Sequence, residues 1–67
     1  MAGPGLTRRE WEVAALVAEG LTNRQIAQRV FVSRHTVDYH LRSIFRKVDV
    51  TSRTDLTRKV VSEATTI

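Results

Sequence analysis

The chain has 67 residues, a formal net charge of +4 and no cysteine. This length allows one small domain with a modest core, and without cysteine neither disulfides nor thiolate metal sites can reinforce it. No apolar run approaches the roughly 18 residues needed to span a membrane, and the N-terminus lacks the apolar segment of a signal peptide. Little room remains for an enclosed substrate pocket, so we expect a binding module and not an enzyme.

The first five residues, MAGPG, contain two glycines and one proline and show no periodicity. They are predicted to form a flexible lead, either a remnant of cloning or the end of a linker from a longer protein. Residues 6–67 are expected to form the domain itself.

The first helix is predicted over about 8–19. Thr7 and Glu10 have the spacing of a capping box, in which each side chain accepts a hydrogen bond from the other residue's backbone N–H. An apolar stripe with helical spacing follows, and Gly20 is a natural stop.

The next two helices are predicted over about 23–30 and 34–48. Thr22 and Gln25 repeat the capping box at the start of the earlier helix, and Ser33 is the expected N-cap of the later one. Because only a short turn separates them, the pair is predicted to be a helix-turn-helix.

A fourth helix is predicted over about 53–63, with Ser52 as its N-cap and Asp55 near the positive end of its dipole. The sequence contains no strand pattern. The predicted fold class is therefore all-α, a compact four-helix domain with a central helix-turn-helix.

Positive charge is concentrated in the predicted helix-turn-helix. Residues 23–47 contain six basic residues and one acidic residue, a net charge of +5, whereas the flanking segments are close to balance. The basic residues are Arg24, Arg29, Arg34, Arg42, Arg46 and Lys47, and the acid is Asp38. This distribution indicates a polyanionic partner, most plausibly the backbone of double-stranded DNA.

The helix over 34–48 is predicted to have one face for the core and the opposite face for a partner. The core stripe consists of Val37, Leu41, Ile44 and Val48. The outer set, flanked by Asp38 and Ser43, consists of His35, Tyr39, Arg42 and Arg46.

A helix fits the major groove of DNA, and its N-terminal half reaches the bases. Tyr39 and Arg42 are therefore candidates for base contact, and Arg42 could hold guanine O6 and N7 together. Asp38 cannot bind phosphate, but it could accept from cytosine N4 or hold a neighbouring arginine. The expected contacts with the DNA backbone are Asn23, Arg24, Arg34, Arg46 and Lys47.

The same residues also have ordinary structural interpretations. A basic helix face is usually solvated, and Tyr39 could simply cover apolar surface. His40 is more typical of a packed histidine, and it points away from His35, so the two cannot share a metal ion. Ser33, His35 and Asp38 do not align as a catalytic triad. We therefore expect no catalytic residue, no metal site and no cofactor.

Several segments, in order and at matching intervals, resemble one known family. They are LTRRE at 6–10, EG at 19–20, TNRQIA at 22–27, VSRHTV at 32–37, TVxxHL at 36–41 and FRKVDVTSR at 45–53. Together they resemble the C-terminal DNA-binding domain of LuxR-type (GerE-like) bacterial transcription regulators, and the resemblance extends from Leu6 to about Val61.

The resemblance implies a four-helix domain whose third helix lies in the major groove. It implies that Asp38, Tyr39 and Arg42 face bases, and that Thr36 and the arginines touch the DNA backbone. We add His35, from the outer face, to the backbone contacts.

The resemblance also implies partners outside this segment. Helix 4 of such domains commonly supplies a dimer contact, here through Leu56, Val60 or Val61. Because such regulators usually carry a separate N-terminal sensor, residues 6–67 are expected to be the C-terminal output domain of a longer cytoplasmic, nucleoid-associated regulator. RNA polymerase is a further candidate partner.

Two residues depart from the family's pattern. Asp38 stands where lysine is frequent, so one expected DNA contact has changed sign. Asp49 stands where glycine is frequent, and aspartate tolerates the left-handed conformation better than most residues, so the turn should survive.

Two other functions fit the same residues. One is the promoter-reading fourth region of sigma factors, which has a similar architecture. The other is a basic protein-interaction module that binds an acidic partner.

Overall fold

The computed structural model describes residues 5–65, which form four α-helices and no strand within that range. The helices are α1 (Arg8–Ala18), α2 (Asn23–Val30), α3 (Arg34–Val48) and α4 (Arg53–Thr65). The all-α prediction is confirmed, although α1 ends one residue earlier than expected and α4 extends two residues further. Residues 1–4 of the predicted lead lie outside the described residues.

Both predicted capping boxes are present. In α1, the Thr7 hydroxyl accepts from the Glu10 backbone N–H at 3.1 Å, and Glu10 Oε1 accepts from the Thr7 N–H at 2.9 Å. In α2, Thr22 and Gln25 exchange the same two bonds, at 3.2 and 2.8 Å. These bonds satisfy N–H groups that have no partner within a helix, so they fix where each helix begins.

The other two predicted caps are present as well. The Ser33 hydroxyl accepts from the Thr36 backbone N–H at 3.1 Å, and the Ser52 hydroxyl accepts from the Asp55 N–H at 3.1 Å. The C-terminal end of α1 is followed by Gly20 at a φ of 94°, a left-handed conformation that favours glycine.

Two helices end on non-glycine residues in the left-handed conformation. Asp49, which follows α3, has a φ of 59°, so the turn survives the loss of glycine as expected. Phe31, which follows α2, has a φ of 61° and is 92% exposed. Its conformation creates the sharp turn of the helix-turn-helix, and its ring gains little packing in return.

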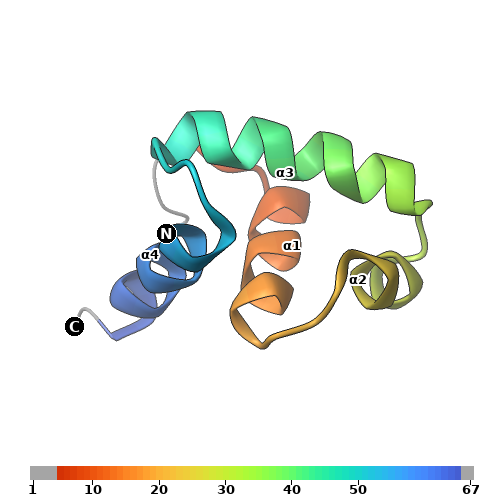
Figure 1. The fold of residues 1–67 in the computed structure, drawn as a ribbon, viewed down its shortest axis with the longest axis horizontal. Helices are drawn as coiled ribbons and strands as arrows, with labels where there is room; N and C mark the ends of the chain where they lie inside the picture. Colours follow the sequence, from red (N-terminus) through yellow and green to blue (C-terminus); the bar gives the residue numbers. More distant parts are fainter. Residues whose placement is uncertain (1–4, 66–67) are drawn as a thin grey trace.

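Helix α1 is the centre of the packing because it contacts each of the other three helices. Figure 1 shows α1 between α2 and α4, with α3 lying along one side of the molecule. The largest fully buried side chains are Ile26, Ile44, Leu56, Val13 and Val37. All four residues of the predicted α3 core stripe are buried, so the predicted orientation of that helix is confirmed.

Replacing Phe31 with asparagine should stabilise the domain. Asparagine adopts the left-handed conformation more readily, which relieves about 1 kcal/mol of backbone strain, and the exposed ring has little packing to lose. Phe31→Ala is the matched control, because it keeps the strain and should change stability little. Urea denaturation followed by circular dichroism measures both. A clear loss of stability in both variants would mean that the ring is packed in solution.

Candidate nucleic-acid interface

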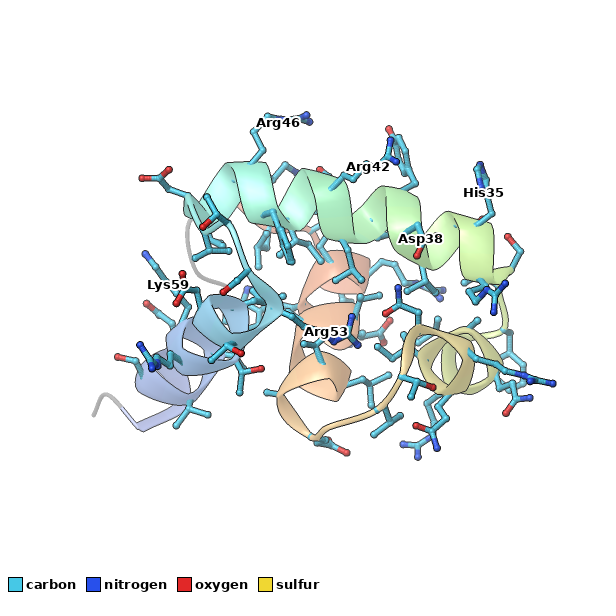
Figure 2. All side chains as sticks on the ribbon, in the orientation of Figure 1. His35, Asp38, Arg42, Arg46, Arg53 and Lys59 are labelled. Atoms are coloured by element: carbon cyan, nitrogen blue, oxygen red, sulfur yellow. The ribbon has the colours of Figure 1, made fainter. Side chains whose placement is uncertain are left out.

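The outer face of α3 is free of the other described helices. Figure 2 shows His35, Arg42 and Arg46 projecting from α3 on the side away from the rest of the domain. Tyr39 belongs to the same face, is 69% exposed, and has its ring centre 6.0 Å from that of His40. Two arginines, a histidine and a tyrosine therefore lie within reach of a partner that approaches this side.

Asp38 lies on the flank of that face and turns toward α2 (Figure 2). Its Oδ1 accepts a hydrogen bond from Asn23 Nδ2 at 2.7 Å. Asn23 Oδ1 in turn accepts from Arg53 Nη1 at 2.6 Å, and Arg53 Nη2 donates to the Leu21 carbonyl at 2.8 Å. Asp38 thus holds an asparagine directly and an arginine only through it. A direct contact with a neighbouring arginine, one of the two roles that the sequence left open for Asp38, is not what this network shows.

The expected backbone contacts divide into free and engaged side chains. Arg24, Arg34 and Arg46 are exposed. The hydroxyl of Thr36 is hydrogen-bonded to the hydroxyl of Ser33, with 3.0 Å between the two oxygens. Asn23 is engaged with Asp38 and Arg53, as described above. Lys47 is also engaged, because its Nζ lies 2.9 Å from Oε1 of Glu10.

Glu10 is a charged residue in the core, only 5% exposed. Besides its capping bond, its carboxylate accepts from Ser43 Oγ and Lys47 Nζ, both at 2.9 Å. Burial raises the pKa of Glu10, but the hydrogen bonds from Lys47, the Thr7 backbone and Ser43 outweigh it, together with the Lys47 charge. The pKa falls from its ordinary value of 4.5 to about 2.

The sequence revealed only the capping role of Glu10. Nothing in the spacing links Glu10 to Lys47, which lies 37 positions later. Arg53 was missed in the same way, although it joins α4 to Asn23, 30 positions earlier. Both contacts depend on the tertiary fold, so no local pattern could have indicated them.

The three expected dimer residues of α4 have different environments. Leu56 is 1% exposed and belongs to the core, so it offers no surface to a second copy. Val60 is partly buried against the core, and Val61 is 50% exposed. A contact through α4 would therefore use Val60 and Val61.

Within residues 5–65, no three His, Cys, Asp or Glu side chains lie together in a way that could hold a metal ion. None of the described helices is both long and apolar enough to cross a membrane.

The short turn between α2 and α3 and the exposed outer face of α3 together define a helix-turn-helix domain, an architecture that many DNA-binding proteins use. Residues 4–60 match the family described as bacterial regulatory proteins, luxR family. Because this match includes most of the chain, the chain belongs to the luxR family.

Similar proteins from several bacteria support this assignment. The chain is 45% identical over 49 residues to the transcriptional regulatory protein LiaR of Bacillus subtilis, a match that covers 73% of this chain and 23% of LiaR. It is 50% identical over 48 residues to the probable transcriptional regulatory protein SgaR of Hyphomicrobium methylovorum, covering 72% of this chain and 23% of SgaR. It is 40% identical over 48 residues to the HTH-type transcriptional regulator MalT of Vibrio campbellii, covering 72% of this chain and 5% of MalT. The matched segment is thus less than a quarter of each relative.

Glu10→Gln should destabilise the domain at neutral pH by about 2 kcal/mol, because the variant lacks the buried ion pair with Lys47 that lowers the pKa of Glu10. A carboxylate with a lowered pKa stabilises the fold above its ordinary pKa. For the wild type, this contribution is therefore lost as pH falls from about 4.5 toward 2. Urea denaturation between pH 7 and pH 2 measures the free energy of unfolding of both proteins. Between about pH 4.5 and pH 2, this free energy should fall less in the variant than in the wild type.

Glu12→Gln is the matched control for this experiment. Glu12 lies on the same helix and pairs with Arg9 at 3.4 Å, but its side chain is 53% exposed. Solvent screens such a pair, so its loss should cost less than about 0.5 kcal/mol. Equal effects of the two substitutions would contradict the special role of Glu10.

Proposed function

We propose that this chain binds double-stranded DNA in a sequence-specific manner, as the output domain of a longer transcription regulator, with α3 in the major groove. The observation that carries the proposal is the outer face of α3. It is uncovered by the other described helices and presents Tyr39, Arg42 and Arg46, while the opposite face of the same helix is buried in the core. Family membership supports the same function.

In this proposal, Asp38, Tyr39 and Arg42 face the bases. Arg42 lies mid-helix on the outer face, and its guanidinium can donate two parallel hydrogen bonds to guanine O6 and N7. Tyr39 supplies an exposed ring and hydroxyl one turn nearer the N-terminal end of α3. Asp38 supplies the only acceptor-only side chain of the three.

The DNA backbone is contacted by the free cations and by the start of α3. These contacts are Arg24, Arg34, His35, Thr36 and Arg46. Asn23 and Lys47 were expected in this group, but both already have protein partners. Lys47 would reach phosphate only by sharing its donors with Glu10, whose buried carboxylate holds it.

The proposed regulator acts as a dimer in the bacterial cytoplasm, at the nucleoid, with Val60 and Val61 of α4 in the contact. If it activates transcription, RNA polymerase is a second partner. The proposed role is binding without a catalytic step or a cofactor.

The two alternative functions are less well supported. The family match favours a regulator over the promoter-reading region of a sigma factor. A protein-interaction module would bind an acidic protein in preference to duplex DNA, so competition between the two ligands separates that alternative.

Arg42→Ala and Arg46→Ala should weaken DNA binding in different ways. Arg42→Ala should lose discrimination at one base position, worth about 1–3 kcal/mol. Arg46→Ala should weaken binding to all sequences alike and reduce the slope of log affinity against log salt by about 1. Selection from a random duplex pool and salt titrations measure the two effects. Identical selected sequences for the wild type and both variants would contradict base reading by Arg42.

A duplex with two half-sites one helical turn apart should bind more tightly than a duplex with one half-site, because two copies then contact each other. Val61→Asp should abolish this gain while leaving binding to the single half-site unchanged. Thr54→Asp is the matched control, since it places the same charge at an exposed position of the same helix. Analytical ultracentrifugation of the complexes gives the stoichiometry, and a one-to-one complex on the double site would contradict the dimer.

A further inference from the structure

We infer that Asp38 is a specificity-determining residue that accepts a hydrogen bond from an exocyclic amino group of a base, and that Asn23 and Arg53 are positioning residues that hold it for this task. The inference rests on the proposed function and deepens it. It assigns to Asp38 a base that carries an exocyclic amino group. It also gives Arg53 of α4 a role in base recognition, although Arg53 itself need not touch DNA.

A chain of hydrogen bonds connects three helices through these residues. Arg53 is the first residue of α4, and its guanidinium donates to the Leu21 carbonyl and to Asn23 Oδ1, at 2.8 and 2.6 Å. Asn23 is the first residue of α2, and its Nδ2 donates to Asp38 Oδ1 on α3 at 2.7 Å. Figure 2 shows Arg53 on the inner side of the domain and Asp38 between it and the outer face of α3.

The chemistry of the three groups fixes the direction of every bond in the chain. A guanidinium can only donate, so the asparagine oxygen must face Arg53. The asparagine NH₂ then faces Asp38, whose carboxylate can only accept. Reversing the amide would put a donor against a donor and an acceptor against an acceptor. Arg53 therefore determines the orientation of Asn23, and Asn23 determines that of Asp38.

This arrangement uses one oxygen of Asp38 and leaves Oδ2 for another donor. Asp38 is exposed and shares with Arg42 an open groove of about 250 Å³ beside α2. In the major groove, the donors are N4 of cytosine and N6 of adenine, whereas guanine O6 and N7 and thymine O4 are acceptors. A fixed carboxylate should accept from the first pair and repel the second.

Asp38 and Arg42 can recognise neighbouring bases with complementary hydrogen-bonding groups. They are four residues apart, about one helical turn, on adjoining parts of the surface of α3. Arg42 offers only donors and Asp38 only acceptors. The preferred DNA site should therefore place base acceptors near Arg42 and a base amine near Asp38.

Selection from a random duplex pool tests the inference with the whole chain. The wild type should prefer cytosine or adenine at one position, and Asp38→Ala should lose that preference while keeping the others. Replacing the preferred base pair so that thymine or guanine stands there should weaken wild-type binding about tenfold, and the duplex chosen identifies whether N4 or N6 is the donor.

Asn23→Asp tests the positioning role without removing the partner of Arg53. The new carboxylate can still accept from Arg53, but it has no hydrogen to donate to Asp38. The tenfold base preference should fall to less than about threefold. When Asp38 is already replaced by alanine, Asn23→Asp should have no further effect on the base preference. Arg53→Lys should lower the preference in the same way, because one ammonium cannot hold both acceptors in the same geometry. Gln28→Ala, an exposed change on the same helix, is the matched control.

The outcomes distinguish this inference from the proposed function. Sequence-specific binding in which Asp38→Ala changes no base preference would overturn the inference and leave the proposed function intact. So would an Asn23→Asp effect of equal size with and without Asp38. Absence of any preferred sequence for the wild type would overturn the proposed function, and the inference with it. Thermal melting of each variant confirms that the comparison is between folded proteins.

Discussion

The buried carboxylate of Glu10 fixes the position of α3. A charge that is 5% exposed is costly unless it is paired and hydrogen-bonded, and here its partners are the Thr7 backbone, Ser43 and Lys47. Two of these partners lie on α3, four residues apart. The helix must therefore turn Ser43 and Lys47 toward α1, and its outer face, with Arg42 and Arg46, is directed outward as a consequence.

Arginines from other helices hold both ends of α2. Arg9 of α1 donates to the Val30 carbonyl at 2.7 Å, just before the left-handed Phe31. Arg53 of α4 donates to Leu21 and Asn23 at the opposite end. Part of the positive charge of this chain thus serves the fold. A count of basic residues overstates the charge that is free for DNA, and the exposed cations on the outer side of α3 are the better guide.

The helix starts and the buried face of α3 could be predicted because the residues that determine them lie within a few positions of one another. Each hydroxyl N-cap lies three residues before the N–H group it satisfies, and the apolar spacing of α3 identified its buried stripe. The left-handed Phe31 was not anticipated, since neither its size nor its side chain favours that conformation. The contacts that Glu10 and Arg53 make with other helices could not be predicted, because those partners lie 30 or more positions away. The dimer role of Leu56 came from the family resemblance alone, and the core covers that side chain.

The most direct test of the central claim, that the outer face of α3 meets DNA, is an NMR titration of the isotope-labelled chain with its selected duplex. We predict that the largest amide shift changes lie in α3, around Tyr39 and Arg42, and at the start of α2. Val13 and Val17 in the buried part of α1 should change little. Changes concentrated on α4, with α3 unaffected, would contradict the account.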